Sequence, residues 1–516
     1  MFREPDINDV KAKAAGLGIT LTDAEATLYQ RFLAEKLPQM DAFVQDPDGI
    51  VSGPRFPGAR EWGYRPDTAE DPLKAWLLKT TIEGAEAGPL KGKRVSLKDH
   101  IALAGLPETF GAFAFDSFVP DYDATVVTRS LEAGATIVGK HVMDGLAGGF
   151  AFGGGIGDYG RVLNPHQHDH LSGGSSSGSA AALVMGETDI SYGGDQGGSI
   201  RIPASWTGCV GLKPTFGLVS HFGIGFGSDQ SIDYTGPMTM TVEDCALALD
   251  VTAGRDGLDP RQTADVPETY NSMATLNDGV KGLRIAILEE GFANATLEVD
   301  EAVHAAIEVL VGLGATTSKV SVPEHFKIPT AQMALGAEGG LGIRQVGYMG
   351  AWARGWYPES TIEAVMRETI IGGDRLNPNM IGRLLLGLYN RDIYSGRVYA
   401  RAQNIRAKYV AAYDALWSDF DVLIMPTTPT QAPLFEPIRD KLAALEHALT
   451  VTNVGVANTQ PFNFTGHPAI SVPVEKKSGL PVGMQIVAPF FRDDLTLQVA
   501  QAYAHAVPFD DYIKVG

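Results

Sequence analysis

The stretch 171–203, LSGGSSSGSAAALVMGETDISYGGDQGGSIRIP, constrains the fold of this chain more than any other. It contains two Gly-Gly-Ser units, which open at Gly173 and Gly197. Glycines let a backbone turn sharply and bring its N–H groups close to a bound group. The small apolar run 178–185 predicts a buried helix between the two units, and 190–192 predicts a short strand. A Gly/Ser linker is the alternative, but linkers contain no interleaved apolar helix and strand.

Both loops are similar, residue by residue, to those of the amidase signature family, a large group of amide hydrolases. The first loop reads GGSSSGS and the second reads DQGGSIR. The sequence GLKPT at 211–215 follows at the family's distance, and the interval between Ser175 and Ser199 is also that of the family. The family's third catalytic residue is a lysine in a strand–Lys–Asp pattern, which Lys98 in VSLKD matches.

The resemblance implies a serine amidase that works through an acyl-enzyme and a Ser-cisSer-Lys triad. An amide carbonyl resists attack, so the nucleophile needs a base, the oxyanion needs donors and the leaving nitrogen needs a proton. The family's scheme makes Ser199 the nucleophile, Ser175 the proton relay and Lys98 the base. The remaining implied residues are Gln196, Gly197 and Gly198 with Ser199 for the oxyanion and substrate, and Asp195, Arg201 and Ser176 for structural support.

The choice of base follows from what the two motifs contain. No histidine lies in either motif, so the usual imidazole base is not indicated. Lys98 can replace it only when neutral, and burial lowers a lysine's pKa because water no longer solvates the ammonium. Taken alone, Lys98 would be an ordinary solvated lysine. The ordered set of this lysine and two serines, with family-like flanks, is specific.

Composition narrows the class of protein. The chain has 516 residues, of which 44% are hydrophobic and 20% charged, as in a globular protein. The formal charge of −20 repels phosphate backbones, so nucleic acid is not an expected partner. Two cysteines imply no disulfide framework. No secretory signal and no apolar run of roughly 18 residues is visible, so we expect a cytoplasmic protein without membrane attachment.

The order of patterns predicts an α/β protein of several parts. From Pro89 onward strands alternate with helices, which favours a largely buried sheet. The resemblance implies the amidase-signature fold, a large mixed β-sheet core flanked by α-helices. We expect an N-terminal α-helical region at 1–72, the two parts of the signature core at 73–260 and 375–516, and a smaller inserted domain at 261–374.

The N-terminal region has its own helical pattern. Thr22 and Glu25 have the spacing of a capping box, and apolar residues recur at helical spacing as far as Val44. Pro38 should kink or break this run. The apolar stripe fits a helical hairpin packed on the core and also a dimerisation element. A homodimer is our prediction.

Two further patterns admit a functional and a structural interpretation. His166, His168 and His170 alternate as metal ligands on a strand can, but Asn164-Pro165 starts a turn, which favours solvated loop histidines and no metal. The Gly-rich aromatic run from Trp352 to Tyr357 is either a satellite core or a lid over an acyl pocket.

We therefore predict hydrolysis of a small-molecule carboxylic amide to the acid and ammonia or an amine, without a cofactor. The long N-terminal extension and the DQGGS loop most resemble bacterial broad-specificity and enantioselective amidases. The alternatives within the family are a carbamate or aryl-anilide hydrolase with the same triad and a glutamine-hydrolysing subunit of an amidotransferase. A non-catalytic scaffold protein is the alternative from a different class. The preferred acyl group and leaving amine stay open.

Overall fold

A computed structural model describes residues 5–46, 53–147, 156–225, 228–346, 356–371, 376–437, 442–443, 446 and 454–509. The chain divides into two compact units, 1–52 and 53–516. Within the described residues, no helix has both the length and the apolar character needed to cross a bilayer. Both cysteines are buried and free.

The first unit is a pair of helices, α1 (Ile7–Gly16) and α2 (Asp23–Val44). The predicted capping box is present, because the Thr22 hydroxyl accepts from the Glu25 N–H and the Glu25 carboxylate accepts from the Thr22 N–H. Pro38 lies inside α2 and does not break it. A proline removes one backbone N–H donor. The helical turns before and after Pro38 keep α2 continuous despite this loss.

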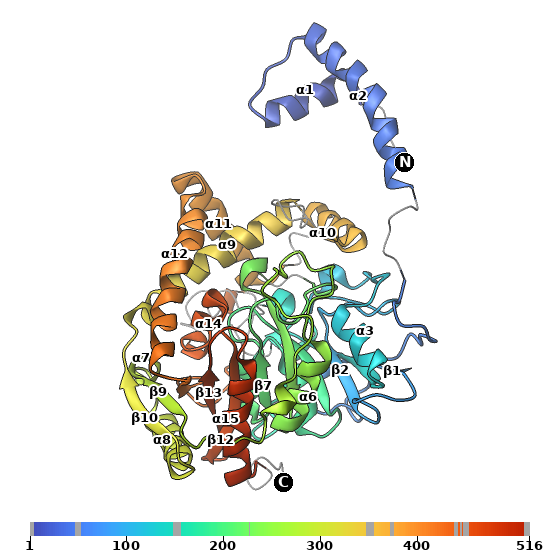
Figure 1. The fold of residues 1–516 in the computed structure, drawn as a ribbon. Helices are drawn as coiled ribbons and strands as arrows, with labels where there is room; N and C mark the ends of the chain where they lie inside the picture. Colours follow the sequence, from blue (N-terminus) through green and yellow to red (C-terminus); the bar gives the residue numbers. More distant parts are fainter. Residues whose placement is uncertain are drawn as a thin grey trace. The chain divides into compact units, whose positions relative to one another are not determined.

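The second unit is built on one mixed sheet, which has eleven strands within the described residues (Figure 1). Their spatial order is β1-β3-β2-β6-β8-β7-β12-β13-β11-β9-β10. The strands are β1 (Trp76–Glu83), β2 (Arg94–Lys98), β3 (Thr136–His141), β6 (Ile190–Asp195), β7 (Val210–Lys213), β8 (Tyr234–Thr239), β9 (Arg284–Leu288), β10 (Thr316–Val320), β11 (Val422–Pro426), β12 (Ala469–Lys477) and β13 (Leu480–Val487).

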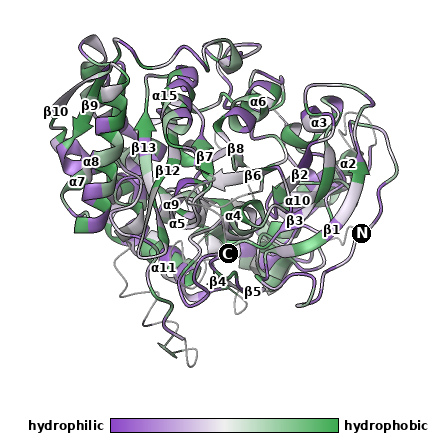
Figure 2. Ribbon diagram, turned by 90° about the horizontal axis from the view of Figure 1, so that it is seen from below, coloured by the Kyte–Doolittle hydropathy of each residue, from purple (hydrophilic) through white to green (hydrophobic). Residues whose placement is uncertain are grey.

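Helices cover both faces of this sheet, which confirms the predicted fold class (Figure 2). One face packs against α3 (Thr125–Glu132), α6 (Val242–Thr252), α8 (Leu297–Gly312) and α15 (Asp493–Ala506). The other face packs against α4 (Ser177–Val184) and α5 (Arg201–Thr207). The central strands are buried on both sides, as their nearly continuous apolar sequence requires.

A cluster of long helices stands at one end of the sheet. It contains α9 (Ile328–Val346), α10 (Glu359–Ile371), α11 (Pro378–Tyr394) and α12 (Arg397–Asp414), and α9 also packs on the short α14 (Gln460–Thr465). Because α9 contacts α10, α11 and α12, helices on both sides of residue 374 pack together. Strands β9 and β10 join the main sheet. The four-part division of the chain stays a prediction.

Two parallel strands bring the two sequence motifs together. β2 ends at Lys98 and β6 ends at Asp195, and the strands pair in parallel, with Leu97 opposite Tyr192. The carboxyl ends of neighbouring parallel strands meet at one edge of a sheet, where α/β proteins place their sites. The predicted strand at 190–192 and helix at 178–185 are thus confirmed within a few residues, and Lys98 ends a strand, as the resemblance of VSLKD implies.

Candidate active site

Lys98 and Ser175 are in direct contact. Lys98 Nζ donates to Ser175 Oγ over 2.7 Å and to the Gly194 carbonyl over 3.1 Å. The Gly174–Ser175 peptide bond is cis. The Ser176 N–H donates to the Ser199 carbonyl over 3.2 Å, which joins the two serine loops next to this lysine. A proton can therefore pass between the amine and the Ser175 hydroxyl without any movement of the backbone.

The three candidate residues differ in their access to solvent. Lys98 is 0% exposed, Ser175 is 1% exposed and Ser199 is 9% exposed. A nucleophile has to reach the substrate, whereas a base that works through a relay does not. The order of burial therefore favours Ser199 as the group that meets the substrate.

The loop 195–201 is held by a buried carboxylate. Asp195 Oδ1 accepts from the Gly198 N–H over 2.7 Å, and Oδ2 accepts from the Ile200 N–H over 3.2 Å. Gly198 has φ +126°, and a Cβ at this position would collide with the Thr459 side chain, so only glycine fits. The N–H groups of Gln196, Gly197 and Ser199 have no acceptor among the described residues.

Arg201 completes the support of this loop. Its Nε and Nη2 each lie 2.9 Å from one oxygen of Asp195, a two-pronged ion pair that is fully buried. Its other donors go to Asn463 over 2.7 Å and to Gln485 over 2.8 Å. Burial alone would raise the Asp195 pKa, but the charge and hydrogen bonds of Arg201 outweigh it and hold the pKa at about 2. The Asp195 carboxylate that holds the loop is therefore ionised at physiological pH.

The electrostatics around Lys98 bring the pKa of its amine close to the physiological range. Burial lowers the Lys98 pKa to about 8, because the ammonium loses its hydration. The charges of Asp144, Asp233 and Asp195 oppose this fall. A pKa near the working pH is what a general base requires.

The sequence did not point to several residues that position this loop. Gln332 of α9 donates to the Gln196 carbonyl over 2.7 Å, and Thr459 donates to the Gly197 carbonyl over 2.6 Å. The Gln196 side chain donates to Asp233 Oδ1. Asp233 lies in the run SIDYTGPMT, which resembles the sequence of the amidase signature family, and this resemblance could have indicated its role. Gln332 and Thr459 lie in no recognisable motif.

The serines that follow Ser175 do not share one role. Ser176 Oγ donates to the Gly194 carbonyl over 3.3 Å, next to the Lys98 contact. The hydroxyls of Ser177 and Ser179 are buried and have no partner in the described part of the chain.

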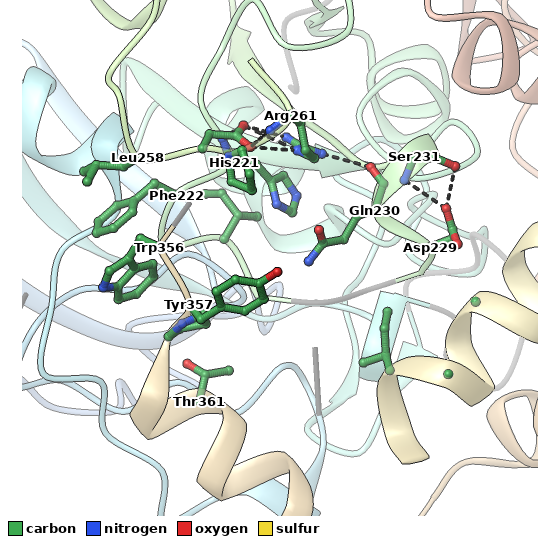
Figure 3. A pocket seen from close by; sticks show the side chains of 18 of the residues that line it. His221, Phe222, Asp229, Gln230, Ser231, Leu258, Arg261, Trp356, Tyr357 and Thr361 are labelled. Atoms are coloured by element: carbon green, nitrogen blue, oxygen red, sulfur yellow. Dashed lines mark hydrogen bonds and ion pairs between the residues drawn. The ribbon is translucent and has the colours of Figure 1, made fainter. Parts of the chain in front are cut away.

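A cavity of about 790 Å³ lies between the helix cluster and the segments 221–224, 229–231 and 258–261 (Figure 3). Such a volume suits a small-molecule ligand. Trp356 and Tyr357, from the aromatic run, line it, while Trp352 lies outside the described residues. The Trp356 ring lies 4.2 Å from Phe222 and 4.7 Å from Tyr122, centroid to centroid, so the aromatic run contributes to one wall.

The three alternating histidines do not converge. His166 Nε2 contacts the Thr207 carbonyl at 2.8 Å, His168 is exposed, and His170 pairs with Asp169 at 2.8 Å. Across the described residues, no group of three or more His, Cys, Asp or Glu side chains is placed to hold a metal ion.

Comparison with known proteins decides the family. A family model described as Amidase matches residues 65–497. The chain belongs to the amidase family. An enantioselective amidase of Rhodococcus rhodochrous is 38% identical over 460 residues, which cover 87% of this chain and 86% of that relative. Together these matches identify the protein as an amide hydrolase.

Two further proteins that are similar to this chain have different names. A glutamyl-tRNA(Gln) amidotransferase subunit of Lysinibacillus sphaericus is 38% identical over 430 residues, 82% of this chain and 85% of the relative. The solved structure of 6-aminohexanoate cyclic dimer hydrolase complexed with substrate has a TM-score of 0.71 and 26% identity, and the match covers 83% of this amidase and 88% of that chain. The substrates in these two names differ.

Proposed function

We propose that this amide hydrolase acts through Ser199, Ser175 and Lys98 and forms an acyl-enzyme on Ser199. The observation that carries the proposal is the 2.7 Å contact of Lys98 Nζ with Ser175 Oγ, in a fully buried setting beside the Ser199 loop. The depressed Lys98 pKa supports the role of base. No histidine is needed for this chemistry.

In the first half-reaction, Ser199 Oγ attacks the amide carbonyl carbon. Its proton passes to Ser175 Oγ, while Ser175 passes its own proton to Lys98 Nζ. The unengaged N–H groups of Gln196, Gly197 and Ser199 are the oxyanion donors, because the Gly198 N–H is already bound by Asp195. One such donor is typically worth about 2.7–4 kcal/mol of barrier.

Departure of the amine uses the same relay in reverse, and hydrolysis of the acyl-enzyme then uses it once more. The Lys98 ammonium returns its proton through Ser175 to the leaving nitrogen, so the C–N bond breaks and ammonia or an amine departs. Water then attacks the Ser199 ester and gives its proton to Ser175 and Lys98. The acid leaves and Ser199 regains its proton.

The proposal is tested by turnover and by labelling together. We expect hydrolysis of at least one amide in a panel of aliphatic amides, aromatic amides, anilides, carbamates and glutamine. A fluorophosphonate should modify Ser199 and stop that turnover, because it reacts with activated serines. Labelling of another serine, or turnover that survives complete labelling of Ser199, would refute the assignment.

The panel also separates the alternatives. Turnover of glutamine alone would favour the role of the amidotransferase relative, and preference for carbamates or anilides would favour those hydrolases. A protein with no turnover and no adduct would be a scaffold. A homodimer and a cytoplasmic location stay predictions of the same proposal.

The Ser175 relay predicts a difference between amides and esters. Ser175→Ala should lower kcat/KM by about 10²–10⁴-fold on an amide and by less on the ester of the same acid, because an amine must be protonated to leave and an alkoxide leaves more easily unaided. The measurement is kcat/KM on a matched pair, with a thermal melt. Equal losses on both substrates with a large drop in Tm would make Ser175 a structural residue.

A further inference from the structure

One carboxylate joins the large cavity to the loop that carries Ser199. Asp233 lies between 3-10 helix Gln230–Ile232 and β8, and its side chain is fully buried. Its Oδ1 accepts from the Gln196 side chain, directly next to the oxyanion donors. No part of the proposed chemistry uses this carboxylate.

The same residue is fixed from the cavity side. His221 lines the cavity, and its Nε2 lies 3.2 Å from Asp233 Oδ1, a contact without hydrogen-bond alignment. Arg261, also in the cavity wall, donates to the Asp233 carbonyl over 2.9 Å and to the Gln230 carbonyl over 3.0 Å. Figure 3 shows His221, Arg261 and Gln230 along one side of the cavity.

A second element runs from the same wall to the same loop. Helix α9 supplies Glu338 and Gly339 to the cavity, and two turns earlier its Gln332 donates to the Gln196 carbonyl. Gln196 is therefore held at its carbonyl by α9 and at its side chain by Asp233. Both hydrogen bonds come from segments that also contribute residues to the cavity wall, the 3-10 helix Gln230–Ile232 and α9.

We propose that Asp233 is a positioning residue that holds Gln196, and with it the Ser199 loop, against the wall of the cavity. This inference rests on the proposed function of Ser199. Alignment of this kind acts on the transition state, so its loss should fall on kcat.

Asp233 also acts on the base through its charge. The groups that face Lys98 are the carboxylates of Asp144, Asp195 and Asp233 and the buried imidazole of His100. Each carboxylate favours the protonated amine and so raises the Lys98 pKa. Removal of the Asp233 charge should therefore let that pKa fall further below its ordinary value.

Two substitutions at Asp233 separate its hydrogen bond from its charge. Asp233→Asn keeps an oxygen that can accept from Gln196, so kcat at the alkaline plateau should stay within about fivefold of wild type. The acid limb of its kcat/KM profile should move down by about one pH unit. Asp233→Ala removes the acceptor as well, and its kcat should fall at least about tenfold, with a smaller change in KM.

The half-buried pair Asp300 and His304 on α8, 3.4 Å apart, offers a control away from the site. Asp300→Asn and Asp300→Ala should leave the rate and the acid limb unchanged. An Asp233→Ala kcat no lower than that of Asp300→Ala overturns the positioning role, and an acid limb that stays in place in Asp233→Asn overturns the charge effect. If Asp233→Ala does not fold, Gln196→Ala removes the same hydrogen bond from its donor side, and an unchanged kcat in that variant overturns the positioning role.

Failure of the proposed function has a different signature. Should Ser199→Ala retain turnover, the function itself fails. An inactive Ser199→Ala beside Asp233 variants that behave like the controls refutes only the positioning role.

Discussion

Ser199→Ala loses at least about 10⁴-fold in kcat, with substrate affinity and Tm close to those of wild type. The change removes one hydroxyl from a loop residue, and the loop itself is held by Asp195, Arg201 and Thr459. The relay of Ser175 and Lys98 stays intact but has no nucleophile to activate. Loss of a nucleophile in a triad abolishes nearly all covalent catalysis. The measurements are steady-state kinetics on the best amide of the panel, a binding assay and a thermal melt.

Ser179 provides the matched control for this variant. It is a buried serine of the same glycine-rich stretch, and its hydroxyl has no partner in the described part of the chain. Ser179→Ala should therefore keep kcat within a few-fold of wild type. A Ser199→Ala variant with the activity of Ser179→Ala would eliminate Ser199 as nucleophile.

The sequence predicted the parts of the site whose contacts are local. The glycine-rich loops, the strand that ends at Lys98 and the helix after Ser175 follow from turn residues and periodicity within short windows. Asp195 and Arg201 are six positions apart, and they meet in the structure as a buried ion pair. Contacts between residues so close in sequence depend on the local backbone of the loop, so they can be predicted without knowledge of the rest of the fold.

The remaining contacts could not be predicted because their partners are far apart in sequence. Arg201 reaches Asn463 and Gln485 across more than 250 positions, and Gln332 reaches Gln196 from the helix cluster. A buried glutamine or asparagine has no sequence signature of its own. The cavity could not be predicted for the same reason, because its wall combines residues from distant parts of the sequence, near 122, 222, 260, 340 and 356.

Lys98→Met should lower kcat/KM by about 10²–10⁴-fold, the usual contribution of a general base. In wild type the base works only when deprotonated, and burial lowers its pKa to about 8. The kcat/KM of wild type should therefore rise about tenfold per pH unit below pH 8 and level off above it. In Lys98→Met the residual activity should lose this limb, because the titrating group is absent. The measurement is a pH–rate profile of both proteins on an amide.

Lys213 separates the loss of a base from the loss of any buried lysine. It is also fully buried, and its Nζ donates to the Pro214 carbonyl over 2.9 Å and lies 3.9 Å from the Tyr234 ring centroid. It has no contact with Ser175 or Ser199 among the described residues. Lys213→Met can lower Tm, but the folded molecules should keep the acid limb near pH 8. If the acid limb of the pH–rate profile persists unchanged in Lys98→Met and vanishes in Lys213→Met, Lys98 is not the base.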